Sequence, residues 1–145
     1  MSQLSEKKIR AGLKQAKYMS YYSTFERYHL GAVLYSKGKI IAQGCNSRKT
    51  SPLQKELNRE RGFDPDESCA LNSLHAETAC LLKTRYMDID MSKAIMYIYR
   101  EHQNGEKALA RPCKGCMKAL KSFGVKTICY TTESGYCVER IDCDE

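Results

Sequence analysis

Two short motifs constrain this chain more than any other feature of its sequence. The first is His75-Ala76-Glu77, and the second is Pro112-Cys113-Lys114-Gly115-Cys116. Cys113 and Cys116 are three residues apart, so on a helix they share a face and can hold one metal ion between them. A proline at position 112 suits the first turn of such a helix, whose N-terminus favours thiolates. These features predict a helix that begins with a pair of metal-binding thiolates.

Three of these side chains are ligands that Zn²⁺ prefers, namely the imidazole of His75 and the thiolates of Cys113 and Cys116. Three protein ligands leave a fourth position for water, which is typical of a catalytic zinc site rather than a structural one. Glu77 would then be the general acid/base that a hydrolytic reaction requires. It follows His75 by two residues, roughly 200° around a helix. Both side chains therefore reach one ion only if the ion lies beyond the N-terminal end of that helix.

A C-x-x-C pair has two other interpretations, a redox pair or one half of a structural zinc ribbon. A ribbon needs a second pair at the same spacing. The remaining cysteines form no such pair: Cys45, Cys69, Cys80, Cys129, Cys137 and Cys143. The catalytic interpretation is favoured because the three ligands, the carboxylate and the proline occur together.

The hydrophobic pattern predicts a chain of the α/β class. Helices are predicted at 5–27, 74–83 and 113–122, and strands at 31–36, 39–43, 94–99, 125–131 and 136–141. Lys37-Gly38 predicts a hairpin turn, and Gly124 predicts a helix end. The aromatic cluster near the end of the first helix is expected to pack in the core: Tyr18, Tyr21, Tyr22 and Phe25. This order of elements predicts a three-layer α-β-α arrangement with helices packed on a mixed sheet.

A long polar segment, 48–73, separates the hairpin from His75. It contains Pro52, Gly62 and Pro65, and residues 53–61 could form a short helix. A connection of this length inside a compact domain is usually functional or mobile. The segment is also basic, with Arg48, Lys49 and Arg59 among its cations.

Length and composition are those of one soluble globular domain over residues 1–145, with 42% hydrophobic and 28% charged residues. No apolar run approaches the ~18 residues of a membrane span, and the N-terminus has no apolar signal region. The eight cysteines then suggest reduced thiols and a cytoplasmic location. The net charge of +7 suits a phosphorylated substrate or a nucleic acid, although solvated charged faces produce the same balance.

The motifs H-A-E and P-C-x-x-C are similar to those of the cytidine/deoxycytidylate deaminase superfamily, because zinc-dependent nucleobase deaminases share the pattern H-x-E…P-C-x-x-C. The resemblance extends from Gly31 to Ile141. It implies a core β-hairpin, then two helices that deliver the zinc site, on a mixed five-stranded sheet. It also implies a Zn²⁺ cofactor bound by His75, Cys113 and Cys116, with Glu77 as the catalytic carboxylate that shuttles protons. The expected reaction converts a cytosine to a uracil with release of ammonia.

The resemblance further implies substrate contacts from Asn46 and from the backbone of Ala76. The position of the basic segment resembles that of an insert in deoxycytidylate deaminases, where Arg48, Lys49 or Arg59 would meet a 5′-phosphate. The expected partner is therefore a small pyrimidine nucleotide or nucleoside, of the dCMP or cytidine type. The sequence does not choose between these substrates.

Two other functions remain possible from the sequence. A deaminase of cytosine or adenine in single-stranded DNA or RNA would use the basic charge and the tyrosines. Against it, the chain has no Trp and lacks the Ser-Trp-Ser-Pro-Cys motif of polynucleotide cytosine editors. A non-catalytic zinc-binding protein of the same fold is the other alternative, and the presence of Glu77 argues against it.

The protein is expected to form a homo-oligomer of unspecified size. Several relatives have a C-terminal helix beyond the last strand, and this chain ends soon after Ile141. An edge or face of the sheet would then be poorly covered, which favours self-association.

Overall fold

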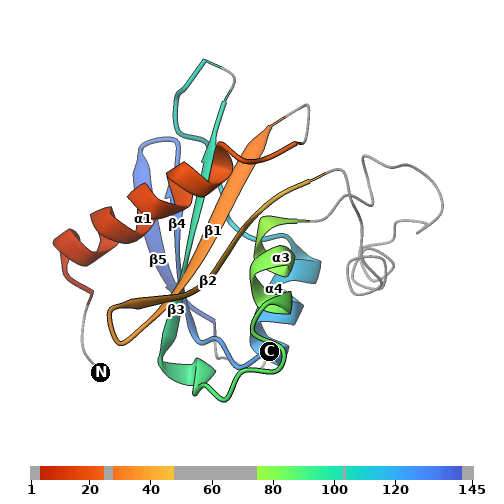
Figure 1. The fold of residues 1–145 in the computed structure, drawn as a ribbon. Coiled ribbons are helices and arrows are strands. Elements are labelled where there is room, and N and C mark those ends of the chain that lie inside the picture. Colours follow the sequence, from red (N-terminus) through yellow and green to blue (C-terminus); the bar gives the residue numbers. More distant parts are fainter. Residues whose placement is uncertain (1–3, 25–27, 48–74, 103, 142–145) are drawn as a thin grey trace.

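The computed structural model describes residues 4–24, 28–47, 75–102 and 104–141 (Figure 1). The predicted helix at 53–61, together with Arg48, Lys49 and Arg59, lies outside these residues. The elements are α1 (Glu6–Ser20), β1 (His29–Ser36), β2 (Lys39–Cys45), α3 (Ala76–Leu82), the 3₁₀ turn η1 (Met91–Lys93), β3 (Ala94–Glu101), α4 (Lys114–Ser122), β4 (Thr127–Thr132) and β5 (Gly135–Arg140). This order confirms the predicted succession of helices and strands and adds η1.

The strands form one mixed sheet of five strands in the order β2-β1-β3-β4-β5. β3 and β4 run parallel, and the other neighbouring pairs are antiparallel. The predicted hairpin joins β1 to β2 through Lys37 and Gly38, whose φ angles of 53° and 78° are both positive. Two positive φ angles are those of a type I′ turn, which matches the twist of the flanking strands. The mixed α/β fold predicted from the sequence is confirmed.

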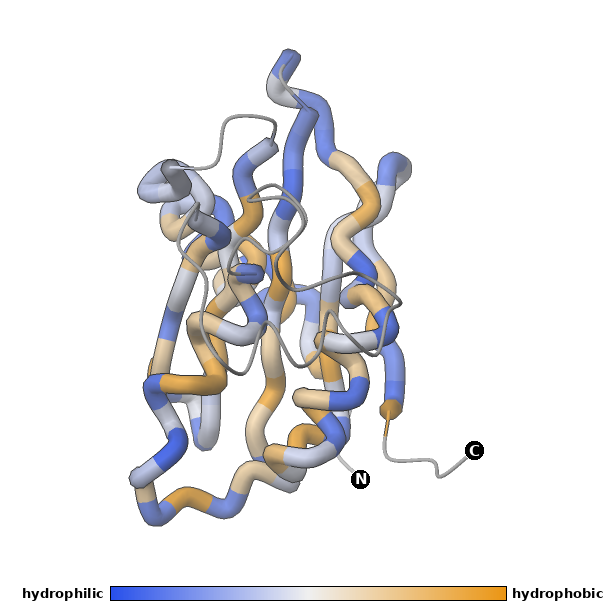
Figure 2. The backbone as a smooth tube through the Cα atoms, turned by 90° about the vertical axis from the view of Figure 1, so that its right-hand side faces the viewer, coloured by the Kyte–Doolittle hydropathy of each residue, from blue (hydrophilic) through white to orange (hydrophobic). Residues whose placement is uncertain are grey.

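Helices cover both faces of this sheet, with α1 on one face and α3 and α4 on the other (Figure 1). Successive residues of β1 point to opposite faces, so Val33 packs with α1, whereas Leu34 packs with α3 and α4. Hydrophobic stretches recur along the strands and helices in the middle of the molecule, and hydrophilic loops lie at its upper end (Figure 2). No helix in the described part of the chain has the length and apolar composition that a membrane span requires.

The first helix is shorter than predicted, because α1 ends at Ser20 rather than near residue 27. Its buried stripe, Ile9, Leu13, Ala16 and Ser20, follows the helical period and ends there. Gly31 shows how closely the last turns of α1 approach β1, since a Cβ on Gly31 would lie 1.9 Å from the carbonyl oxygen of Ala16. The helix therefore ends at Ser20, and the chain then returns to begin β1 at His29.

The prediction that the aromatic cluster packs in the core is wrong for its described members. Tyr18, Tyr21 and Tyr22 are 46%, 55% and 73% exposed. None of them falls on the buried stripe of α1, and Tyr21 and Tyr22 follow its last residue. The aromatic composition of this stretch was a poorer guide to burial than the helical period.

Candidate metal centre and active site

The starts of α3 and α4 bring the two sequence motifs together. His75 is the N-cap residue of α3, and its φ and ψ of −82° and 152° place it in extended backbone before the helix. Cys113 is the N-cap of α4, where its sulfur accepts a hydrogen bond from the Cys116 backbone N–H. The predicted helices thus begin slightly later than expected, at residues 76 and 114. This shift places His75 and Cys113 at the open ends of their helices.

The side chains of His75, Cys113 and Cys116 converge on one point. Nδ1 of His75 lies 3.2 Å from Sγ of Cys116 and 3.7 Å from Sγ of Cys113. All three potential ligand atoms lie within 4.8 Å of one another. In the described part of the chain, no other group of three His, Cys, Asp or Glu side chains is arranged to hold a metal ion.

The two sulfurs differ in their protonation. A hydrogen bond from the Cys116 thiol lowers the pKa of Cys113 to about 3, against the opposing effect of burial, and His75 lowers it further. The same hydrogen bond and burial raise the pKa of Cys116 well above its usual value, with a smaller contribution from the charge of Glu77. The donor set fits Zn²⁺, since a neutral imidazole and two thiolates are its common ligands and binding displaces the thiol proton.

Glu77 lies in the first turn of α3 and is only 4% exposed. Because His75 precedes the helix instead of belonging to it, the separation of roughly 200° expected on a continuous helix does not apply. Both side chains line one cavity, together with Cys113. A carboxylate in this place can exchange protons with a molecule that occupies the cavity.

The position of α3 depends on a close approach to β2 at Gly44. A Cβ on Gly44 would lie 2.9 Å from the Cβ of Ala79 and 2.9 Å from the backbone nitrogen of Cys80. Ala76 is fully buried at this contact and belongs to the core shared by α3, α4 and the sheet. Its side chain is not part of the cavity wall, and the expected substrate contact of its backbone stays a prediction.

The cavity next to the three potential ligands has a volume of about 140 Å³. It lies where β1 begins and where β2 and β3 end, and its wall consists of Tyr28, Leu30, Asn46, His75, Glu77, Arg100, Leu109, Ala110, Arg111 and Cys113. Ligands of α/β sheets commonly bind at the carboxyl ends of parallel strands, where β3 ends here. The predicted residues Asn46, His75, Glu77 and Cys113 are therefore brought to one cavity.

Asn46 is 2% exposed and ties together the segments that border this cavity. Its Oδ1 accepts hydrogen bonds from the Leu30 backbone N–H at 2.9 Å and from the Ser23 hydroxyl at 2.6 Å. Its Nδ2 donates to the Tyr28 carbonyl at 3.0 Å. These bonds give Asn46 a positioning role at the start of β1, and its contact with a substrate stays a prediction.

Six further residues line the cavity that were not among the predicted site residues, and three of them have polar side chains, namely Tyr28, Arg100 and Arg111. Arg100 lies at the carboxyl end of β3. Ligands commonly bind at the carboxyl ends of strands in α/β sheets, so this position could have indicated Arg100 from the sequence. Arg111 forms a bidentate ion pair with Glu139 of β5, at 3.0 Å and 2.8 Å, and the Tyr130 hydroxyl donates to the same carboxylate at 2.9 Å. This network attaches the loop before Cys113 to the far edge of the sheet.

Replacing Glu139 with Gln should reduce stability more at pH 7 than at pH 3.5. The bonds from Arg111, and secondarily from Tyr130, lower the pKa of Glu139. A carboxylate with a lowered folded pKa contributes stability above its unfolded pKa, about 4.3, and loses that contribution as the pH falls through its folded pKa. Because the pair is partly exposed, we expect a difference of about 1 kcal/mol or less in the free energy of unfolding at pH 7.

Urea unfolding of the wild-type and variant proteins at both pH values measures this difference. Any loss of metal at low pH affects both proteins and cancels in the comparison. Glu133→Gln is a matched control, since Glu133 is exposed and its ion pair within the described residues is a long contact of 3.4 Å with His102, which is itself exposed. An equal loss of stability at the two pH values would show that the carboxylate charge is not responsible.

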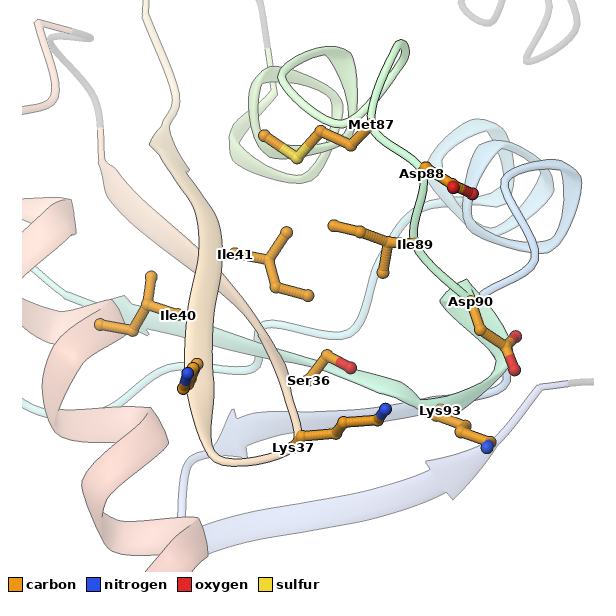
Figure 3. A pocket seen from close by; sticks show the side chains of 10 residues that line it. Ser36, Lys37, Ile40, Ile41, Met87, Asp88, Ile89, Asp90 and Lys93 are labelled. Atoms are coloured by element: carbon orange, nitrogen blue, oxygen red, sulfur yellow. The ribbon is translucent and has the colours of Figure 1, made fainter.

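A larger groove, of about 690 Å³, lies at the opposite end of β1, β2 and β3. In Figure 3, Ile41 and Ile89 lie in the middle of this surface and Met87 lies above them, whereas Asp88 and Asp90 lie at the right and Lys37 and Lys93 below. A β-bulge at Ile41 of β2 contributes to this surface, since Leu34 pairs with Ala42 while Tyr35 pairs with Ile40. Among the described residues no His or Cys lines the groove, which distinguishes it from the smaller cavity.

Comparison with known proteins agrees with this geometry. Residues 6–132 match the family model described as the cytidine and deoxycytidylate deaminase zinc-binding region. The apo dCMP deaminase of cyanophage S-TIM5 is similar in structure, with a TM-score of 0.62 and 24% identity over 90% of this chain and 87% of that one.

The same phage enzyme in complex with dCMP and dUMP matches with a TM-score of 0.62 and 24% identity over 90% of this chain and 85% of that chain. The cytidine deaminase of Burkholderia pseudomallei gives a TM-score of 0.62 and 16% identity over 95% and 94% of the two chains. At these identities the structural likeness establishes the shared fold. A search of curated proteins by sequence found no match.

Proposed function

Because this chain belongs to the cytidine and deoxycytidylate deaminase zinc-binding family, we propose that it is a zinc-dependent hydrolytic deaminase of a cytosine-containing nucleotide or nucleoside. The product is the corresponding uracil compound, and ammonia is released. The observation that supports this most is the convergence of His75, Cys113 and Cys116 beside the buried carboxylate of Glu77 in one cavity.

Zn²⁺ bound by His75, Cys113 and Cys116 would supply the Lewis acidity that lowers the pKa of water towards ~7. Glu77 accepts a proton from the attacking water and passes it to the cytosine ring nitrogen. It then delivers the second proton of that water to the departing amino group, which leaves as ammonia. Burial of Glu77 keeps this transfer away from bulk solvent.

The remaining wall of the cavity would hold the pyrimidine. Leu30, Leu109 and Ala110 supply apolar surface, and Tyr28 and Arg100 lie at the same cavity. The volume of about 140 Å³ is below the range of roughly 300–1,000 Å³ that drug-sized ligands occupy. This volume suits the pyrimidine end of the substrate.

Product mass spectrometry of the zinc-loaded protein tests the proposal. The substrates are cytosine, cytidine, deoxycytidine, CMP, dCMP, and single-stranded DNA and RNA. We expect turnover of a small pyrimidine compound. Turnover of the polynucleotides alone would make the protein an editor instead, and bound zinc with no turnover of any substrate would favour a non-catalytic zinc protein.

We expect a homo-oligomer, because apolar side chains are exposed at both edges of the sheet. Ile40 of β2 is 45% exposed, and Tyr136 and Val138 of β5 are 42% and 44% exposed. Light scattering at micromolar concentration should give a mass that is a multiple of 16.6 kDa. Val138→Lys should reduce that mass if β5 is at the interface, whereas Tyr86→Lys, in the loop after α3, serves as the control. A monomeric wild-type protein would refute the prediction.

A further inference from the structure

Arg100 is held in a fixed place at the end of β3. It pairs with Leu30 of β1 in the sheet, and its backbone N–H donates to the Thr131 hydroxyl at 3.2 Å. Its carbonyl oxygen accepts a hydrogen bond from the Ala108 N–H at 2.9 Å. The backbone of Arg100 is thus anchored on both sides, and its side chain lines the same cavity as Glu77 and Cys113.

The guanidinium group of Arg100 is held mainly by stacking. It lies over the ring of Tyr28, 4.6 Å from the ring centroid. Nη1 makes a long hydrogen bond of 3.4 Å to the Leu109 carbonyl, and the buried Nε has no hydrogen-bond partner among the described residues. Because Nε is closed to solvent, a ligand oxygen would bind the terminal nitrogens of the guanidinium rather than Nε.

Arg100 and Arg111, the two arginines of the cavity, differ in their ion pairing. Arg111 is paired with the Glu139 carboxylate through two hydrogen bonds. No carboxylate within the described residues pairs with Arg100. Arg100 therefore gives the cavity wall a positive charge that no carboxylate of the described residues neutralises. The buried carboxyl group of Glu77 lies in the same wall.

We propose that Arg100 binds the 5′-phosphate of the substrate, so that this deaminase prefers a pyrimidine nucleoside monophosphate to the nucleoside. The inference rests on the proposed function and specifies the substrate class of the same site. A planar guanidinium suits a phosphate because it donates parallel hydrogen bonds to two oxygens. Glu77 repels the phosphate while Arg100 attracts it, and this directs the cytosine end of the substrate towards the metal ligands.

The test compares dCMP with deoxycytidine in the wild-type protein and in Arg100→Ala. For dCMP, kcat/KM should fall by about 10- to 150-fold, which corresponds to loss of a hydrogen bond to a charged group. For deoxycytidine the fall should be markedly smaller, so that the ratio of kcat/KM for dCMP to kcat/KM for deoxycytidine decreases. Arg100→Lys should recover part of the dCMP activity, because lysine keeps the positive charge but cannot donate two parallel hydrogen bonds to the phosphate. Arg85→Ala is the matched control, since Arg85 also lies over a tyrosine, Tyr86, at 5.2 Å but is not part of the cavity.

Calorimetric binding of the products dUMP and deoxyuridine gives a readout that does not depend on turnover. Arg100→Ala should weaken dUMP binding alone, with an unchanged metal content. An equal loss for nucleotide and nucleoside, or no loss for the nucleotide, would overturn the assignment of Arg100. Absence of turnover of either substrate by the zinc-loaded wild type would contradict the proposed function, and selective loss of dUMP binding in the variant would still support the phosphate contact.

Discussion

Glu77→Gln is expected to abolish deamination while the protein keeps its metal. The carboxylate is the proton carrier of the proposed reaction, and a positioned acid/base contributes typically 10²–10⁴-fold to a rate. Glutamine has nearly the same shape, so it fits the space of a side chain that is 4% exposed without opening a cavity. We therefore expect a loss of at least about 100-fold in kcat, with little change in thermal stability.

Product formation and zinc content, measured on the same preparation, test this expectation. Glu106→Gln is the control, because Glu106 is exposed and lies in the loop between β3 and α4. Normal activity of Glu77→Gln would remove the residue from the mechanism. Loss of metal together with activity would instead make Glu77 necessary for the metal site itself.

Cys113→Ser is expected to lose both the metal and the activity. Cys113 is one of three potential ligands whose atoms lie within 4.8 Å of one another, and a zinc site needs its thiolates. Cys113 also caps α4, accepting a hydrogen bond from the Cys116 N–H at 3.4 Å. Serine is a preferred N-cap residue, so this variant removes the ligand and retains the cap. Zinc affinity should fall by more than the about 10- to 100-fold that loss of an outer-shell partner causes.

Metal analysis after dialysis, combined with thermal unfolding, distinguishes loss of the ligand from loss of the fold. The melting temperature of Cys113→Ser should match that of wild-type protein treated with a chelator. Cys137→Ser is the matched control, since Cys137 is also partly buried and is not part of the ligand group. A variant at position 113 that is both active and replete with zinc would contradict the proposed ligand set.

Local features of the fold could be predicted because they depend on neighbouring residues. The Lys37-Gly38 turn follows from the need for positive φ at both positions, and Gly124, with a φ of 93°, ends α4 as expected. The end of α1 could not be placed from the aromatic residues that follow it. It lies where the last turn of α1 approaches Gly31 of β1, a contact between different elements.

The chemistry that the site can have follows from its residue types. The types and spacing of His75, Glu77, Cys113 and Cys116 indicated a metal with thiolate and imidazole ligands and a carboxylate beside it. The surroundings of these residues became visible in the folded chain, where Arg100 stacks on Tyr28 and Asn46 is hydrogen-bonded to the start of β1. Spacing constrains residues within one helix or turn, whereas these contacts depend on the order of the strands. The antiparallel pairing of β1 with β3 is what places Leu30 beside Arg100 at the cavity.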